Sequence, residues 1–252
     1  MEPTYRSRRL WKICAFLVAF VAGSGCQTKS HFADHGLRKF EIRLEPELVG
    51  ELYGSATAKV AYPARLFVDG KEFEIQISAA GNSTIRSPKK SFNLKLRDGD
   101  FRGAEEFRIT ASTNDKSMLR AFLSLEVFRA AGLPTSWAEP AYVYLNDTSL
   151  GLYVAIERID ADYFANRGID WDRLFEAEGD ADFGPTFEAR IESAISVKPK
   201  PEDWSALVAV ARTVARPGDD EFMTALFRIL DREAVIAYMA ASQITTHWDG
   251  FN

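Results

Sequence analysis

The chain has 252 residues, of which 46% are hydrophobic and 27% are charged, and its formal net charge is −5. A chain of this length and apolar content can bury a sizeable core. The acidic balance argues against non-specific nucleic-acid binding, because the phosphate backbone attracts basic proteins. It still permits a local basic pocket for phosphate.

Residues 1–25 have the pattern of a secretory signal peptide. Four basic residues between Arg6 and Lys12 precede an apolar run, Ile13–Ala22, that ends in small residues. This run has about ten residues, whereas a membrane-spanning helix needs ~20. We therefore expect export without a permanent transmembrane anchor. Removal of the leader, which also carries Glu2, would bring the net charge to about −8.

The two cysteines are Cys14, inside the leader, and Cys26, just after it. Cys26 follows Gly23-Ser24-Gly25, which looks like a lipoprotein signal in which the cysteine becomes the lipidated first residue, although an aliphatic residue is usual at Gly23. We expect a membrane-anchored lipoprotein or a cell-envelope protein. The alternative is ordinary cleavage near Gly25 that leaves a free thiol. In both cases no intramolecular disulfide is expected in the mature chain.

The first part of the globular region, Leu37–Leu96, is predicted to be rich in strands. The stretches Lys39–Leu44, Lys59–Val68 and Phe73–Ala79 alternate or carry β-branched and aromatic residues. Asp69-Gly70 separates the last two stretches and predicts a hairpin turn between them.

The strand signals continue downstream. One strand ends before Asp98-Gly99-Asp100, and Glu106–Thr110 is predicted to be another. Strands at Ala141–Leu145 and Leu150–Ile156, split by Asn146-Asp147, complete the predicted sheet.

One helix is predicted between these strands. Asn114 or Asp115 can cap its start, and Gly132-Leu133-Pro134 ends it. Its apolar stripe is Met118, Leu119, Phe122, Leu125, Val127 and Phe128. The region up to residue 157 is therefore predicted to be a sheet with one helix.

The pattern changes after Asp160. A short helix is predicted near Ala161–Asn166, and a less regular stretch follows to about Lys200. Helical periodicity then covers three segments, Asp203–Val214, Asp219–Leu230 and Arg232–Thr246. Asp231 can cap the last of these. Its apolar stripe is expected to be core: Val235, Ile236, Tyr238, Met239 and Ile244.

The most informative segment, Gly81–Leu96, is a small polar turn that leads into an alternating strand. Phe92 and Leu94 share one face, and counting back places Lys90 on the same inward side. A lysine aimed with core residues needs an anionic partner. The small residues before it leave backbone N–H groups free to surround an anion, and Arg86 adds a fork suited to phosphate oxygens. The alternative is a basic hairpin tip with solvated lysines.

Five segments, in this order and at this spacing, make the chain resemble the CotH-type kinase family, the spore-coat and secreted relatives of protein kinases. They are Gly81–Leu96, Asn114–Arg120, Tyr142–Asn146, Gly151–Asp160 and His247–Asn252. The resemblance implies a two-lobed, protein-kinase-like α+β fold. Its antiparallel, strand-rich N-terminal lobe is expected at residues 37–157 and its helical C-terminal lobe at residues 158–252.

The resemblance implies a kinase that transfers the γ-phosphate of ATP to a protein hydroxyl, with Mg²⁺ as metal. Such a reaction needs clamped phosphates, held metal ions and a carboxylate near the attacking hydroxyl, and a cleft between two lobes is a favoured ligand site. The implied cover over the phosphates is the turn Gly81–Arg86, with Asn82 and Ser83. The implied contact to the phosphates is Lys90; Lys89 and Lys95 are less favoured substitutes, because they face the other way along the strand.

Three further residues have implied roles. Glu157 ends a strand at the expected change of lobe, where its carboxylate can contact the nucleotide or pair with a lysine; the alternative is a surface salt bridge with Arg158 or a lysine. Arg120 can reach phosphate, or it is an ordinary exposed arginine. Asp115 is expected to be a helix cap rather than a ligand.

Asp249 is the implied catalytic base, in the segment His247–Asn252. Its role is to orient and deprotonate the acceptor hydroxyl. Without the resemblance, Asp249-Gly250 is simply a turn. No metal site is expected from the three histidines, because no ligand spacing links them.

The family continues past the matching segment into strands with a tryptophan and with acidic residues that hold the metal. Since these 252 residues contain no counterpart, we expect either a fragment of a longer reading frame or a truncated relative with weak or absent transfer. A protein substrate is the implied partner, and no nucleic acid is expected. The alternative function is a noncatalytic envelope or coat binding protein on the same scaffold.

Overall fold

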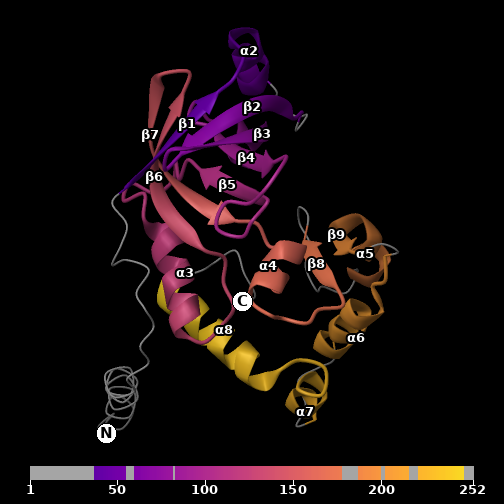
Figure 1. Cartoon of the computed structure of the whole chain (residues 1–252). Helices are drawn as coiled ribbons and strands as arrows, with labels where there is room; N and C mark the ends of the chain where they lie inside the picture. Colours follow the sequence, from indigo (N-terminus) through magenta and orange to yellow (C-terminus); the bar gives the residue numbers. More distant parts are fainter. Residues whose placement is uncertain are drawn as a thin grey trace, which may run out of the picture. The chain divides into compact units, whose positions relative to one another are not determined.

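The computed structural model describes residues 37–54, 60–81, 83–177, 187–199, 202–215 and 221–246. The expected leader with Cys26, and the beginning of the strand predicted from Lys59, lie outside this part of the chain. The described residues form a mixed α+β fold, in which a seven-stranded β-barrel is followed by helices (Figure 1).

The strand order around the barrel is β1-β2-β3-β4-β5-β7-β6. The strands are β1 (Arg38–Arg43), β2 (Tyr62–Val68), β3 (Lys71–Ala80), β4 (Ser91–Leu96), β5 (Glu106–Thr110), β6 (Ala138–Leu145) and β7 (Thr148–Glu157). Neighbours pair antiparallel except β1 and β6, which pair parallel and close the barrel. The expected antiparallel sheet is therefore wrong at this pair. No tight turn joins β1 to β6, so no local signal fixes their relative direction.

Two predicted hairpin turns are confirmed. Asp69 and Gly70, between β2 and β3, have φ values of 53° and 74°, and Asn146 and Asp147, between β6 and β7, have φ values of 46° and 67°. Positive φ at both central residues is typical of the type I′ turn, whose twist suits a two-residue hairpin. Asn, Asp and Gly are the residues that tolerate it.

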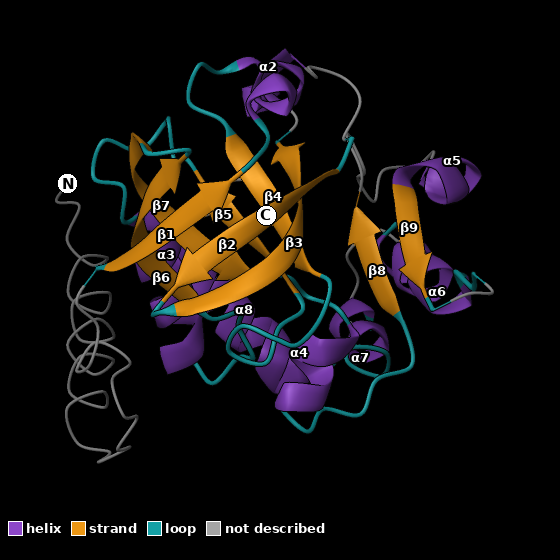
Figure 2. Cartoon of the chain, turned by 45° about the horizontal axis from the view of Figure 1, so that its top comes forward, coloured by secondary structure: helices purple, strands orange, loops and turns teal. Residues whose placement is uncertain are grey.

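The core lies inside the barrel, whose curved strands are seen in Figure 2. Alternate residues of each strand point inward, as period two requires. The largest fully buried side chains are Phe40, Ile42, Leu52, Leu66, Ile75, Ile77, Phe92, Leu94, Phe107, Ile109, Val143 and Tyr153. Leu52 comes from the helix α2 (Pro46–Gly54) between β1 and β2 and joins this core.

The helix α3 (Arg120–Ala130) packs on the outer face of β6 and β7. Phe122 contacts Ala138 and Val154 there, and all three are buried. The predicted end of the helix is confirmed, because Gly132 has φ of 83° and terminates the helical geometry.

The helix α8 (Arg232–Thr245) packs against α3, and the rings of Phe128 and Tyr238 meet edge to face with centroids 5.4 Å apart. The predicted cap is confirmed: Asp231 Oδ1 accepts the N–H of Ala234 at 2.8 Å. The cap fixes where this helix begins.

The apolar stripe of α8 is not all core, and this prediction is wrong at three positions. Ile236, Met239 and Ile244 are 47%, 53% and 71% exposed. The residues buried on α8 are instead Ala241 and Ser242. Helical periodicity identifies apolar positions, but it does not say which of them meet a neighbouring element.

The region after β7 holds more regular structure than expected. Its elements are α4 (Ala161–Asn166), β8 (Leu174–Ala177), α5 (Phe187–Ala194), β9 (Ile195–Lys198), α6 (Ser205–Val214) and α7 (Phe222–Leu226). The two four-residue strands pair antiparallel, and Ile191, Ile195, Val197 and Ala211 form a small buried cluster. Strands this short carry too few residues for period two to be recognised. None of the described helices has the length and apolar character needed to cross a bilayer.

Candidate functional site

The polar turn between β3 and β4 contains a short 3₁₀ helix, η1 (Ser83–Arg86). Gly81 enters it with φ of +112°, and a Cβ at this position would lie 2.5 Å from Thr84 Oγ1. Both the backbone angle and the contact therefore require glycine. Asn82, expected to cover the phosphates with Ser83, lies outside the described residues, and Arg86 is exposed.

Lys90 points inward, as the alternation of β4 predicts, and is only 6% exposed. Its Nζ donates a hydrogen bond to the backbone carbonyl of Ile85 in η1. Within the described ranges the lysines in ion pairs are Lys39 and Lys198, so no described carboxylate neutralises Lys90. A solvated hairpin tip is the wrong description of this residue. A buried ammonium group held only by a neutral carbonyl is costly unless an anion joins it.

Lys89 is also partly covered. Its Nζ donates to the carbonyl of Leu152 at 2.6 Å and lies 4.4 Å from the ring centroid of Tyr153. Burial lowers the pKa of the Lys89 ammonium group. Lys90 thus ties the end of the turn back to η1, and Lys89 ties it to β7.

Asp115 organises the start of α3. Its Oδ2 accepts the N–H of Arg120 at 2.7 Å, and its Oδ1 accepts the N–H and hydroxyl of Ser117 at 3.0 and 2.6 Å. The Ser117 hydroxyl first, and then the Arg120 N–H, lower the pKa of this carboxyl group. The predicted cap is therefore wrong in position: Leu119 is the residue before the helix, and its side chain makes no capping hydrogen bond. Asp115 instead accepts the first helical N–H from five residues upstream. The Arg120 side chain is exposed.

Glu157 is 3% exposed, so the alternative of a surface salt bridge is wrong. Its Oε1 and Oε2 accept from Arg167 at 3.0 and 2.5 Å, and Oε2 also accepts the N–H of Trp137 at 2.9 Å. Arg158 instead pairs with Glu106 at 2.6 Å. Glu157 lies two residues after Ala155 and four after Tyr153, which are both in the barrel core, so it shares their inward side. The guanidinium fork of Arg167 neutralises it there, and both carboxylate oxygens are engaged.

The structure separates Lys90 from Glu157. Ser91 Oγ accepts the N–H of Ala111 just past the end of β5, whereas Glu157 pairs with Phe107 near its start. Four residues of strand correspond to about 13 Å. A direct pair between Lys90 and Glu157 is therefore absent. The expected catalytic residue, Asp249, lies outside the described residues with the rest of His247–Asn252.

Arg108, in the middle of β5, is a charged residue that the sequence reasoning missed. Phe107 and Ile109 are fully buried inside the barrel, so Arg108 points outward, and its side chain is exposed. Its Nε donates to Asn93 Oδ1 on β4 at 3.0 Å. The same alternation that located Lys90 could have located it.

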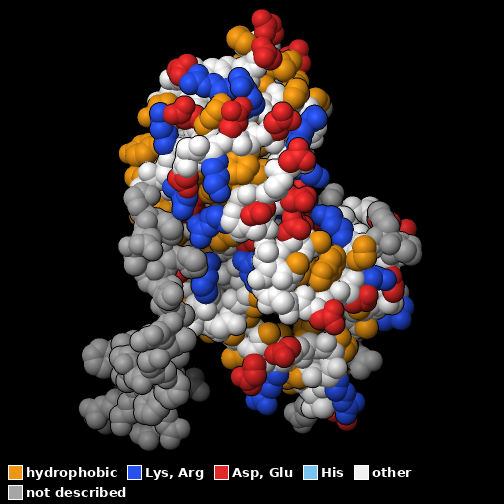
Figure 3. All heavy atoms as spheres, viewed as in Figure 1, with side chains coloured by type: hydrophobic (Ala, Val, Ile, Leu, Met, Phe, Trp, Pro, Cys, Tyr) orange, Lys and Arg blue, Asp and Glu red, His pale blue; other side chains and the backbone are white. Residues whose placement is uncertain are grey.

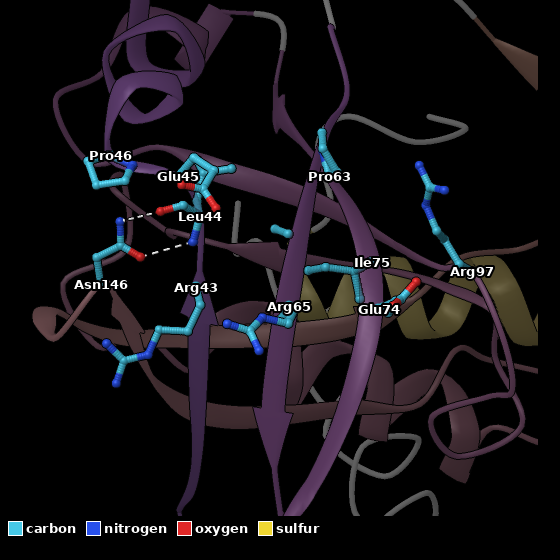
Figure 4. Close-up of a pocket in the computed structure, with 11 residues that line it drawn as sticks. Arg43, Leu44, Glu45, Pro46, Pro63, Arg65, Glu74, Ile75, Arg97 and Asn146 are labelled. Atoms are coloured by element: carbon cyan, nitrogen blue, oxygen red, sulfur yellow. Dashed lines mark hydrogen bonds between the residues drawn. The ribbon is translucent and has the colours of Figure 1, made fainter.

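A cavity of about 540 Å³ lies elsewhere, over β1, β2 and β3 (Figure 4). Arg43, Arg65 and Arg97 line it, together with the Leu44 backbone that hydrogen-bonds to Asn146. Two of these arginines are already paired, Arg43 with Asp147 and Arg65 with Glu72. Figure 3 shows acidic and basic side chains interspersed over this face. The predicted site residues do not line the cavity, so size alone does not make it the functional site.

The described part of the chain contains no group of three or more His, Cys, Asp or Glu side chains placed to hold a metal ion.

The chain is similar to known proteins over most of its length. The family model described as CotH kinase protein matches residues 77–252. Inner spore coat protein H of Bacillus subtilis (strain 168) is 25% identical over an alignment 221 residues long, which covers 84% of this chain and 61% of that protein. The chain thus spans about three fifths of the length of this curated relative.

Proposed function

This chain belongs to the CotH kinase family, which implies ATP, and we propose that it is the nucleotide-binding part of an exported kinase that phosphorylates a protein hydroxyl. The finer proposal is a two-lobed, protein-kinase-like arrangement, with the barrel as the first lobe and the helices as the second. We place the first lobe at residues 37–157 and the second at residues 158–252.

The main support for the proposal is that Lys90 is buried without a carboxylate partner among the described residues. A buried cation normally has a carboxylate partner, because removing a charge from water costs several kcal/mol. Among the described residues, Lys90 forms no ion pair and its side chain donates its hydrogen bond to the Ile85 carbonyl. A phosphate oxygen beside the turn at Ser83–Arg86 would supply the missing negative charge. The exposed Arg86 fork and the backbone N–H groups of the turn would add further donors.

In the proposed reaction, the acceptor hydroxyl oxygen forms a bond to the γ-phosphorus, and the bond from that phosphorus to the β–γ bridging oxygen breaks, releasing ADP. Asp249 accepts the hydroxyl proton. Mg²⁺, when bound, would neutralise charge on the phosphates. Transfer of radiolabel from ATP to protein should occur with a chain extended past Asn252 through its reading frame, and should be lost when that chain carries Asp249→Asn. Measurable labelling that is equal in the two would overturn the role of Asp249.

Nucleotide binding is tested by comparing two lysines of the same strand segment. Lys90 points inward and Lys95 is exposed, so Lys95→Met is the matched control for Lys90→Met. ATP at 100 times its dissociation constant should stabilise the wild type and Lys95→Met by ~2.7 kcal/mol. Lys90→Met should lose most of this stabilisation by ATP. Its free energy of unfolding without ligand should not fall, because the substitution removes a buried charge.

The opposite result separates the two candidate functions. If ATP stabilises none of the three proteins, the noncatalytic envelope or coat module is the better description. If ATP stabilises Lys90→Met as much as the wild type, nucleotide binds but Lys90 is not its contact.

Export and lipidation remain part of the proposal. We propose that Cys26 carries the lipid and anchors the protein at a membrane surface. The wild type should then fractionate with membranes and Cys26→Ser should not; an unchanged distribution would remove the lipid anchor.

A further inference from the structure

Arg108 lies on the outer wall of the barrel, and its two terminal guanidinium nitrogens form no hydrogen bond with the described residues. Arg108 lies opposite Asn93 on β4 and Ile156 on β7 in the strand register. Its only hydrogen bond within the described ranges is from Nε to Asn93 Oδ1, at 3.0 Å. The two terminal nitrogens therefore remain available, on a group whose direction is set by a neighbouring strand.

The electrostatic surroundings of Arg108 are short of negative charge. The nearest acid on its own strand, Glu106, pairs with Arg158 at 2.6 Å, and Arg158 is also 4.0 Å from Glu176. Lys198 takes the other oxygen of Glu176 at 2.5 Å. The acids around this wall are thus shared among several cations, and none forms an ion pair with Arg108 in the described part of the chain.

The pKa of Arg108 agrees with this description. Burial lowers it first and the Arg158 charge lowers it further, with Glu106 opposing. The side chain is nevertheless exposed to solvent. Protein atoms therefore remove part of the hydration of the Arg108 guanidinium, and Arg158 adds a second positive charge beside it. Both effects favour the approach of an anion.

We propose that Arg108, oriented by Asn93, forms an oxyanion contact on the outer wall of β4 and β5 that binds a phosphate group. Its two terminal nitrogens suit bidentate contact with phosphate oxygens. The inference rests on the proposed function in one respect, because the phosphate it expects is that of the nucleotide.

The position of Arg108 is compatible with a ligand that also reaches the turn. Asn93, its strand neighbour, is three residues beyond Lys90. Three residues of strand span about 10 Å, a distance that a chain of phosphates and its sugar can bridge across the rim of the barrel. Lys90 and Arg108 would then contact the same phosphate-bearing ligand, rather than form two unrelated sites.

The test measures binding of ATP, adenosine and inorganic tripolyphosphate to the full chain by calorimetry. Arg108→Gln should weaken ATP and tripolyphosphate at least about tenfold, as expected for loss of charge-assisted hydrogen bonds, and should leave adenosine unchanged. Arg108→Lys should recover only part of the affinity, because it keeps the charge without the fork. Arg65→Gln is the control, since Arg65 is an exposed arginine that already pairs with Glu72. Urea unfolding without ligand checks that each variant is folded.

The outcomes distinguish this inference from the proposed function. ATP binding that is unchanged by Arg108→Gln overturns the inference and leaves nucleotide binding intact. Binding of tripolyphosphate that depends on Arg108, without any binding of ATP, supports the oxyanion contact and overturns the nucleotide site. A wild type that binds neither compound overturns both.

Discussion

Lys90 and Glu157 are both buried charges, but the protein treats them differently. Glu157 has an arginine fork and a backbone N–H, and both its oxygens are engaged. Lys90 has one neutral carbonyl within the described residues. Glu157 is therefore a structural residue that ties the end of β7 to Arg167 beyond α4, whereas Lys90 remains the candidate contact for a ligand.

This distinction predicts the effect of Glu157→Gln. The substitution keeps the shape but removes the charge that neutralises Arg167, so the free energy of unfolding should fall by about 3 kcal/mol in urea titrations. Glu72→Gln is the matched control, since Glu72 and Arg65 form an exposed pair, and should change it by less than about 0.5 kcal/mol. Equal losses in the two variants would show that the Glu157 pair is not special.

Gly81 is the residue on which the shape of the turn depends. Gly81→Ala forces a positive φ on alanine and places its Cβ against Thr84 Oγ1, so stability should fall by more than about 1 kcal/mol. Gly50, exposed in α2, has nothing within 4 Å of an added Cβ. Gly50→Ala should therefore raise the free energy of unfolding by about 0.5–1 kcal/mol. Changes of the same sign in the two variants would contradict this account.

The contribution of Asp115 to the stability of the start of α3 should depend on pH. The folded pKa of Asp115 lies below its ordinary value of 3.8, so its contribution is present above that value and is lost as the pH falls through the folded pKa. Asp115→Asn keeps an acceptor oxygen but loses the charge. The variant should be less stable than the wild type at about pH 7, and the difference should shrink by about pH 3. A difference that is the same at both pH values would contradict the charge effect.

Elements with a local signal could be predicted from the sequence, and elements without one could not. The turns at Asp69-Gly70 and Asn146-Asp147 need residues that tolerate positive φ, and the cap at Asp231 needs a side-chain acceptor, so each is written in a few adjacent residues. The parallel closure of β1 on β6 and the short ribbon of β8 and β9 depend on distant partners. Burial of the α8 stripe likewise depends on what lies beside it.

The candidate site likewise contains residues with a local sequence signal and residues without one. Period two located Lys90 inside the barrel, because the residues on its side of β4 are apolar. It did not reveal that Arg167 neutralises Glu157, since that pair joins a strand end to the residue after a helix. Arg108 was within reach of the same rule, but an outward arginine looks ordinary until its neighbours are known.

In the molecule as a whole, both proposed phosphate contacts lie on the barrel. Its inner side presents Lys90 at the rim beside η1, and its outer side presents Arg108 between Asn93 and Arg158. Family membership supplies the reason to expect ATP. We propose that Lys90 and Arg108 contact its phosphates, and this proposal does not depend on Asp249.

The most direct measurement is a crystal structure of the full chain with a non-hydrolysable ATP analogue. The account predicts a phosphate oxygen within about 3.5 Å of Lys90 Nζ, a typical charge-assisted hydrogen-bond range, with the phosphates lying against the turn at Ser83–Arg86. An analogue bound in another part of the molecule, with Lys90 still held only by the Ile85 carbonyl, would contradict it.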